Sequence, residues 1–260
     1  MPSPRDVLAL IERIRCISSE EERQALLDTL AAVERPTILS FMNAHGVNLC
    51  AKSAPALSAF RASDLLLRDG VALELAMPVL NQPAGFNMNG TDFIPLMLRR
   101  LPARKVAVYG TADPWLGRCI DRLKGETPHR YVDAQHGFHP VAHYIERARH
   151  HRPDIILLAM GMPRQEEVAV ELKRALDHRV LIINGGAIVD FLAGRFARAP
   201  TVIQKLGLEW AFRLVQEPRR LFRRYCVGAF GFAHNVLLMR RAAAMRSSSA
   251  TAPAPMHKEL

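Results

Sequence analysis

The sequence predicts an α/β protein with a Rossmann-like, open, mainly parallel sheet flanked by helices, and a basic helical appendage at its C-terminal end. The main support is a pattern that occurs three times: a strand-length apolar run, a glycine turn and a helical segment. The runs are 105–109 before Gly110, 155–159 before Gly161, and 180–183 before Gly185 and Gly186. They lack polar alternation, as expected of strands buried on both faces. Their turns should meet at the carboxyl edge of the sheet, where backbone N–H groups can hold phosphate; backbone geometry alone is the alternative reason for each glycine.

The first part of the chain adds two helices and two more strands. The expected elements are helices over 5–15 and after the Ser19/Glu22 capping box, a strand over 37–41 and a short strand over 65–67. The first strand leads into Asn43 and the second into Asp69, so both side chains should lie at the same edge as the glycine turns. Turn and capping roles are the alternative for both residues.

Capping and proline signals predict where three later helices begin. Thr91 or Asp92 should cap a helix that follows 87–92, Asp113 should cap a helix that Pro114 starts, and Pro163 should start a helix over 164–176.

A metal site is not predicted. His136, His139 and His143 have suggestive spacing, but Gly137 and Pro140 break the helical register that would align them. The chain also lacks an Asp-x-Asp pair, a common cation clamp of nucleotide-sugar enzymes. Diphosphate charge would then be met by backbone N–H groups and arginine, with no cofactor expected.

Length and composition are those of a globular protein of 260 residues with 49% hydrophobic and 23% charged residues. The four cysteines have no paired spacing, so neither a disulfide framework nor a zinc site is expected, and a reducing cytoplasm fits. No signal peptide is recognised near the start, and no apolar run reaches the length of a membrane span.

The net charge of +10 is concentrated near the C-terminal end. Residues 195–246 contain eleven Arg and Lys against two acids, a balance of +9, which leaves +1 for the rest. Such a segment favours anionic partners: nucleic acid, acidic lipid head groups or a diphosphate. We therefore predict three parts: a catalytic domain over 1–197, a basic amphipathic, membrane-associating appendage over 198–246, and a disordered tail over 247–260.

The appendage is expected to contain two helical segments. The first carries an apolar stripe and ends at Pro218. It is followed by two basic pairs, 219–220 and 223–224, four residues apart on one helical face, and by the mostly apolar run 226–239. That run suits a helix lying in a membrane interface; the alternative is an amphipathic helix packed on the protein.

Several strings together resemble the WecG/TagA/CpsF group, glycosyltransferase family 26. They are Arg68-Asp69-Gly70, Asn89-Gly90-Thr91-Asp92, Gly161-Met162-Pro163-Arg164-Gln165-Glu166, Arg198-Ala199-Pro200, and the segment from Gly207-Leu208-Glu209-Trp210 to Glu217-Pro218-Arg219. The resemblance runs from about residue 37 to 225. It implies inverting, metal-independent transfer from a UDP-sugar to a polyprenyl-diphosphate-linked saccharide, on a Rossmann-like fold whose C-terminal appendage docks on a membrane. The implied location is peripheral, on the cytoplasmic face of the inner membrane.

The resemblance also assigns site residues. Asp69 takes the place of the proposed general base. The expected UDP-sugar residues, from the resemblance and from the turns together, are Asn43, Asn89, Gly90, Asp92, Gly110, Gly161, Gln165, Glu166, Gly185 and Gly186. The expected acceptor-diphosphate and membrane residues are Arg213, Arg219, Arg223 and Arg224. Two positions depart from many members: Phe41 stands where they have Thr, and Asn87 where they have Arg.

Within the group, the stretches 42–45 and 86–89 are most similar to GumM-type glucosyltransferases of xanthan-type exopolysaccharide assembly, so glucose is the expected donor sugar. Transfer of N-acetylmannosamine or its uronic acid to a lipid-linked N-acetylglucosamine is the alternative. Oligomeric state is left open, a homo-oligomer included.

Two other classes of protein explain less. A nucleotide-dependent oxidoreductase should carry a Gly-x-Gly-x-x-Gly turn near its start, and no such string occurs. A non-catalytic nucleic-acid-binding protein would use the basic segment, but it gives no reason for the polar and glycine residues gathered at the strand ends, so nucleic acid is not the expected partner.

Overall fold

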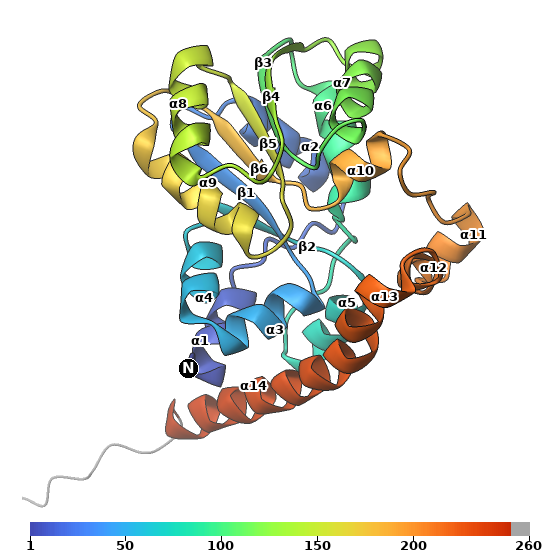
Figure 1. Ribbon diagram of the computed structural model, residues 1–260. Coiled ribbons are helices and arrows are strands. Elements are labelled where there is room, and N and C mark those ends of the chain that lie inside the picture. The colour runs from blue at the N-terminus through green and yellow to red at the C-terminus, as the bar shows by residue number, and fades with distance from the viewer. Residues whose placement is uncertain (251–260) are drawn as a thin grey trace, which may run out of the picture.

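The computed structural model describes residues 1–250 and has a six-stranded, all-parallel sheet in the order β2-β1-β6-β5-β3-β4 (Figure 1). The strands are β1 (Thr37–Met42), β2 (Leu65–Arg68), β3 (Lys105–Gly110), β4 (Arg130–Gln135), β5 (Ile155–Ala159) and β6 (Leu181–Asn184). The predicted fold class is confirmed. β4 was not predicted, because this edge strand carries polar residues such as Asp133, which pairs with Arg147 of the adjacent helix.

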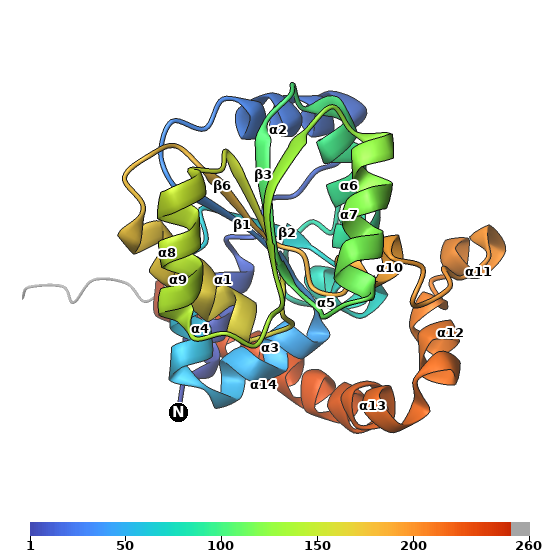
Figure 2. The ribbon, with the colours of Figure 1, turned by 45° about the horizontal axis from the view of Figure 1, so that its top comes forward.

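Helices cover both faces of the sheet (Figure 2). One face is covered by α2 (Glu20–Ala31), α6 (Gly90–Arg100), α7 (Trp115–Glu126) and α10 (Ile188–Leu192). The other is covered by α8 (Val141–His151) and α9 (Arg164–Ala175), and, beside β1 and β2, by α1 (Pro4–Ile11), α3 (Ala44–Lys52), α4 (Ala54–Arg61) and α5 (Val71–Val79). Successive side chains of a strand point to opposite faces, so Leu39 and Phe41 join the core on the first face. On the other face Ile38 joins the core beneath α8 and α9, and Met42 joins a separate core, called the second core, beside α1, α3, α4 and α5.

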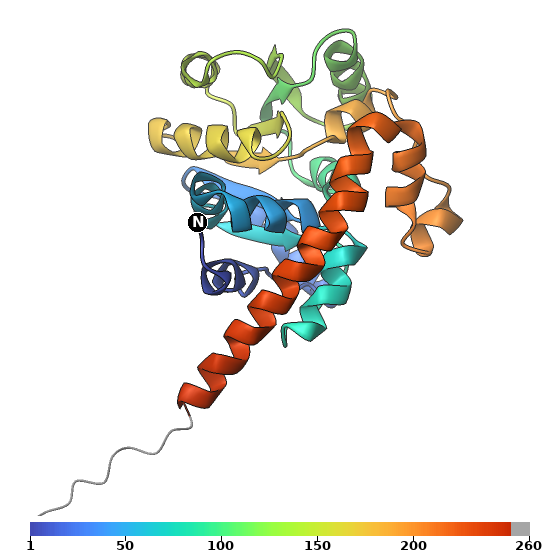
Figure 3. The ribbon, with the colours of Figure 1, turned by 60° about the horizontal axis from the view of Figure 1, so that its bottom comes forward.

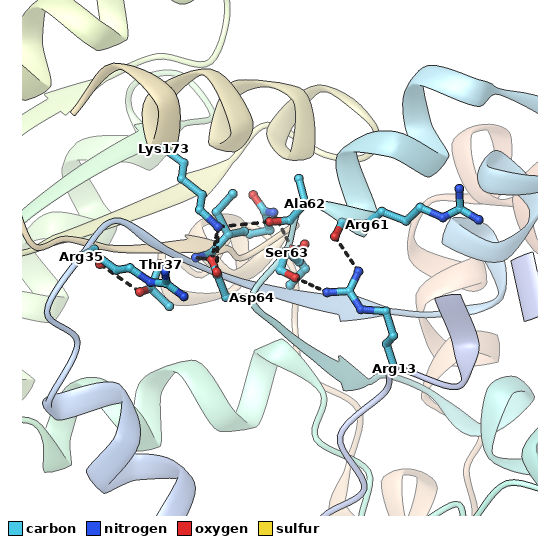
Figure 4. Close-up of polar contacts among 11 residues, drawn as sticks. Arg13, Arg35, Thr37, Arg61, Ala62, Ser63, Asp64 and Lys173 are labelled. Atoms are coloured by element: carbon cyan, nitrogen blue, oxygen red, sulfur yellow. Dashed lines mark hydrogen bonds and ion pairs between the residues drawn. The ribbon is translucent and has the colours of Figure 1, made fainter. Parts of the chain in front are cut away.

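Polar side chains fasten the amino-terminal edge of the sheet (Figure 4). Asp64, just before β2, accepts a hydrogen bond from the N–H of Ile38 in β1 and pairs with Lys173 of α9 at 2.6 Å. Arg13 donates to the carbonyl oxygens of Arg61 and Ser63. These contacts hold the strand starts, and the opposite, carboxyl edge is left for the loops.

The C-terminal segment leaves α10 and passes through short helices before it returns to the body (Figures 1 and 3). They are α11 (Thr201–Lys205), α12 (Glu209–Gln216), α13 (Pro218–Phe222), a π-helical turn (Arg223–Val227) and the long α14 (Gly228–Ala250). The continuous apolar stripe expected before Pro218 is wrong, since Gly207 adopts φ +70° and separates α11 from α12.

α14 packs on α1, α3 and α5 (Figure 3). Its side chains Phe232, Val236 and Met239 are buried in the second core, so the packed-helix alternative describes its inner side. Phe230 and Leu237 remain exposed. The helix runs to Ala250, four residues into the tail predicted as disordered, and 251–260 lie outside the described residues. Within residues 1–250, no helix has both the length and the apolar character needed to cross a membrane.

Candidate functional site

Asn43 and Asp69 lie side by side at the carboxyl edge of the sheet. Met42 and Arg68 are paired in the β1–β2 register, and the N–H of Asp69 donates to the Met42 carbonyl oxygen at 2.8 Å. The next residue of each strand is therefore adjacent, and Asn43 Nδ2 donates to Asp69 Oδ2 at 3.1 Å. The same Asn43 caps α3 by accepting the Gly46 N–H through Oδ1. One side chain thus starts a helix and orients the carboxylate.

Arg68 and Asn87 hold the Asp69 turn through contacts that the sequence analysis did not predict. Arg68 is only 2% exposed and donates to Glu74 and to three carbonyl oxygens, those of Gly70, Ala84 and Gly85. Asn87 accepts the Gly70 N–H at 2.9 Å. The contacts of Arg68 could have been predicted from its place at the end of a buried strand, because a buried cation needs several hydrogen-bond acceptors.

The charge state of Asp69 is set by opposing effects. Its side chain is partly buried, and desolvation raises its pKa above the ordinary value; the Asn43 hydrogen bond and the positive charges of Arg224, Arg213 and Arg68 act in the opposite direction. Within residues 1–250, only Oδ2 carries a side-chain hydrogen bond, from Asn43. The turn therefore presents a carboxylate that binds protons more readily than a free one.

The second half of the edge is organised by Gln165. Gln165 is only 1% exposed. Its Oε1 accepts hydrogen bonds from the N–H of Gly161 at 3.2 Å and from the N–H of Gly186 at 3.0 Å. The Gly185 N–H donates to the Leu158 carbonyl oxygen at 2.7 Å. These three donors were expected to hold phosphate, but each is already bonded within the protein. The Gln165 side chain thus links the turn at Gly161 to the turn at Gly186.

Other expected nucleotide residues also have internal partners. Gly110 packs so closely on β5 that an added Cβ would lie 2.4 Å from the Ala159 carbonyl oxygen. Glu166 is buried and accepts a hydrogen bond from Gln165, and burial raises the pKa of its carboxyl to about 7. Both contribute to the packing beneath the loops.

The Asn89 to Asp92 string starts α6 and contacts the appendage. Asn89, rather than Thr91 or Asp92, is the cap, because its Oδ1 accepts the Asp92 N–H at 3.0 Å. Asp92 pairs with Arg198 at 2.9 Å, and Arg198 also lies 3.2 Å from Glu209 of α12. Gly90 lies against Phe41, whose ring is buried beside Phe93.

Met162 joins the two halves of the edge. A Cβ added at Gly46, in the first turn of α3, would lie 3.6 Å from Met162 Sδ. The loop that follows β5 therefore reaches the helix that Asn43 caps. The Asn43–Asp69 pair and the Gly161–Gln165 turn therefore lie on neighbouring loops at the carboxyl edge of the sheet.

The four expected arginines separate into two groups. Arg213 and Arg224 are partly buried, and their charges act on Asp69. The Arg213 guanidinium lies 4.9 Å from the centre of the Phe191 ring. Arg219 and Arg223 are exposed. The appendage thus places two positive charges beside the carboxylate and two toward solvent.

Comparison with known proteins shows the family to which this chain belongs. The sequence profile of the glycosyl transferase WecG/TagA/CpsF family matches residues 8–246, which includes the Asn43–Asp69 pair and the appendage. This chain belongs to the WecG/TagA/CpsF family. It is a glycosyltransferase.

Two relatives of this WecG/TagA/CpsF glycosyltransferase carry the name N-acetylglucosaminyldiphosphoundecaprenol N-acetyl-beta-D-mannosaminyltransferase. The protein from Staphylococcus aureus strain MW2 is 23% identical over 221 residues, 84% of this chain and 82% of its own. The protein from Bacillus spizizenii strain W23 is 27% identical over 168 residues, 61% of this chain and 63% of its own. These names favour the N-acetylmannosamine alternative over the expected glucose, and the narrower GumM-type resemblance is not shown.

A histidine stack lies beyond β4 of this glycosyltransferase. The ring of His139 is 3.9 Å from that of His136 and 4.0 Å from that of His143. Stacked rings present their faces to each other rather than converging their nitrogens. Within residues 1–250, no group of three or more His, Cys, Asp or Glu side chains is arranged to hold a metal ion.

Proposed function

We propose that this glycosyltransferase moves an N-acetylmannosamine-type sugar from UDP to an N-acetylglucosamine carried on a polyprenyl diphosphate, with inversion at the anomeric carbon. The observation that supports this most directly is Asp69, a desolvated carboxylate oriented by Asn43 and flanked by the charges of Arg213 and Arg224. The sugar and the acceptor follow the names of the relatives, which act on an N-acetylglucosaminyl diphospholipid.

In this proposal, Asp69 removes the proton of the acceptor hydroxyl as its oxygen attacks the anomeric carbon. The bond from that carbon to UDP breaks on the opposite face, and the electron pair leaves with the diphosphate. Desolvation favours the role, because a raised pKa makes the carboxylate a stronger base near neutral pH. Arg213 and Arg224, with the amino-terminal end of α9, would stabilise the negative charge on the departing or the acceptor diphosphate.

The outer surface of the appendage supports docking on a membrane. Large apolar side chains are exposed along the appendage, which also carries the exposed Arg219 and Arg223. They include Val202, Leu206, Val215, Phe222, Val227, Phe230 and Leu237. Apolar side chains that enter a bilayer interface, next to cations that meet acidic head groups, bind a protein peripherally. A lipid-linked acceptor would then be met at the cytoplasmic face of the inner membrane.

A donor panel tests the proposal. The enzyme is given UDP-N-acetylmannosamine, its uronic acid, UDP-N-acetylglucosamine and UDP-glucose, each with a short-chain polyprenyl-diphosphate N-acetylglucosamine, and the lipid product is identified by mass. A product one N-acetylhexosamine heavier, formed from UDP-N-acetylmannosamine, is expected. A hexose product formed from UDP-glucose alone would overturn the sugar assignment and restore glucose.

A further inference from the structure

Polar contacts join the appendage to the body on either side of the segment 201–227, which itself meets the body where Gly207 faces Val71 and Arg213 lies over Phe191. Before this segment, Arg198 pairs with Asp92 of α6. After it, Asn48 of α3 receives the start of α14: Asn48 Nδ2 donates to the Gly228 carbonyl oxygen at 2.7 Å, and its Oδ1 accepts from Asn235 Nδ2 at 2.9 Å. Asn48 is therefore bonded to α14 through both ends of its amide.

Small residues let α14 approach Asn48. A Cβ added at Gly228 or at Gly231 would lie 3.7 Å from the Asn48 amide, so both glycines face it at contact distance. The N–H of Gly228 also closes the π-turn by donating to the carbonyl oxygens of Arg223 and Tyr225. The residue that Asn48 holds is thus the residue that ends the π-turn.

The same face of α3 meets Arg224. His45 and Asn48 are three residues apart and so lie on one side of the helix. Burial, followed by the positive charge of Arg224, lowers the pKa of His45 to about 4, and the same charge acts on Asp69. Along α3, Arg224 therefore lies near His45, and Gly228 lies against Asn48. Asn43 and Asp69 lie at the start of the same helix.

We propose that Asn48 is a positioning residue for sugar transfer: by bonding Gly228 and Asn235 it seats the π-turn on α3 and so holds Arg224 beside Asp69. Asn48 need not touch either substrate. The inference rests on the proposed function, because it assumes that Arg224 stabilises a diphosphate there.

A double-mutant cycle tests it. Asn48→Ala, Arg224→Ala and the double variant are compared in kcat/KM with the short-chain acceptor. Asn48→Ala is expected to lower kcat/KM roughly tenfold, and to change it little when Arg224 is already absent. Independent, multiplying losses would overturn the proposal, as would wild-type kcat/KM in Asn48→Ala. Val236→Ala is the matched control: it loosens α14 through the buried core and leaves Asn48 intact, so its effect should be the same with or without Arg224.

A measurement without substrate separates this inference from the proposed function. Trp210 of α12 lies edge-on to Tyr225 of the π-turn, with ring centres 6.2 Å apart. The chain has two tryptophans, and in a Trp115→Phe background Trp210 alone reports on this contact. Asn48→Ala should increase iodide quenching of Trp210 with little change in the unfolding midpoint, whereas Val236→Ala should lower the midpoint with less change in quenching. Unchanged quenching in Asn48→Ala would overturn the inference even if the donor panel succeeds. Increased quenching would show that Asn48 holds the π-turn in place even if the donor panel fails.

Discussion

Asn43 Nδ2 lies 3.1 Å from Asp69 Oδ2, one residue beyond a strand pair in register, and so the amide that caps α3 also orients the carboxylate. The pair depends on two adjacent parallel strands that end together. A shift of either strand by one residue would separate the two groups. The base of the proposed reaction is therefore placed by the sheet itself rather than by a loop.

Asp69→Asn should lower kcat by about a hundred- to ten-thousandfold, because the amide cannot accept the proton of the acceptor hydroxyl. The amide oxygen can still accept the Asn43 hydrogen bond, so UDP binding should persist. Desolvation raises the pKa of Asp69, which means that its ionised form is disfavoured in the folded state at neutral pH, and the neutral Asn should leave the thermal midpoint unchanged or higher. Calorimetry and a transfer assay check this; turnover near wild type would remove Asp69 from the role.

Arg68→Met should lower the free energy of unfolding by about 3 kcal/mol or more, since a buried guanidinium loses four hydrogen bonds and three partly buried carbonyl oxygens lose their donor. Denaturant unfolding measures the change. Arg152→Met is the control, because Arg152 forms an exposed pair with Asp177 and should cost less than about 1 kcal/mol. Equal losses for the two variants would contradict the bracing role of Arg68.

The fold was predictable where one segment carries its own signal. The apolar run before Gly161 gave β5, and the spacing after Pro163 gave α9. β4 was missed because polar residues suit an edge strand and hide its pattern. The break at Gly207 was missed as well, since apolar periodicity does not report a left-handed φ.

The site was predictable in its residues more than in their contacts. Asn43 and Asp69 were expected at one edge, and they touch. Gln165 was expected beside the donor, but its partner Gly186 lies 21 residues away in another loop, which spacing along the chain cannot indicate. The bonds of Asn48 reach 180 and 187 residues along the chain, so only the tertiary structure brings them together.

Glu166→Gln should stabilise the enzyme more at pH 8 than at pH 5.5. Burial raises the pKa of Glu166 to about 7, and its Oε2 has no hydrogen-bond partner within residues 1–250. A carboxyl whose folded pKa is raised contributes stability below its unfolded pKa, near 4.5, and loses it as pH rises through 7. Wild type should therefore lose about 2 kcal/mol relative to the variant across this range. Unfolding free energies at the two pH values measure it, and a constant difference would contradict it.

Arg223 and Arg224 are neighbours in the π-turn, but they should fail in different assays. Arg223 is exposed beside apolar side chains, so Arg223→Ala should weaken binding to anionic vesicles about fivefold and leave turnover of a short-chain acceptor intact. Arg224 is partly buried near Asp69 and His45, so Arg224→Ala should lower kcat/KM about tenfold or more and leave vesicle binding nearly unchanged. Vesicle sedimentation at two salt concentrations and steady-state kinetics separate the two effects, because salt screens the exposed charge of Arg223 more strongly than the partly buried charge of Arg224. If each variant lost both vesicle binding and turnover, the separate roles of Arg223 at the membrane and Arg224 at the diphosphate would be contradicted.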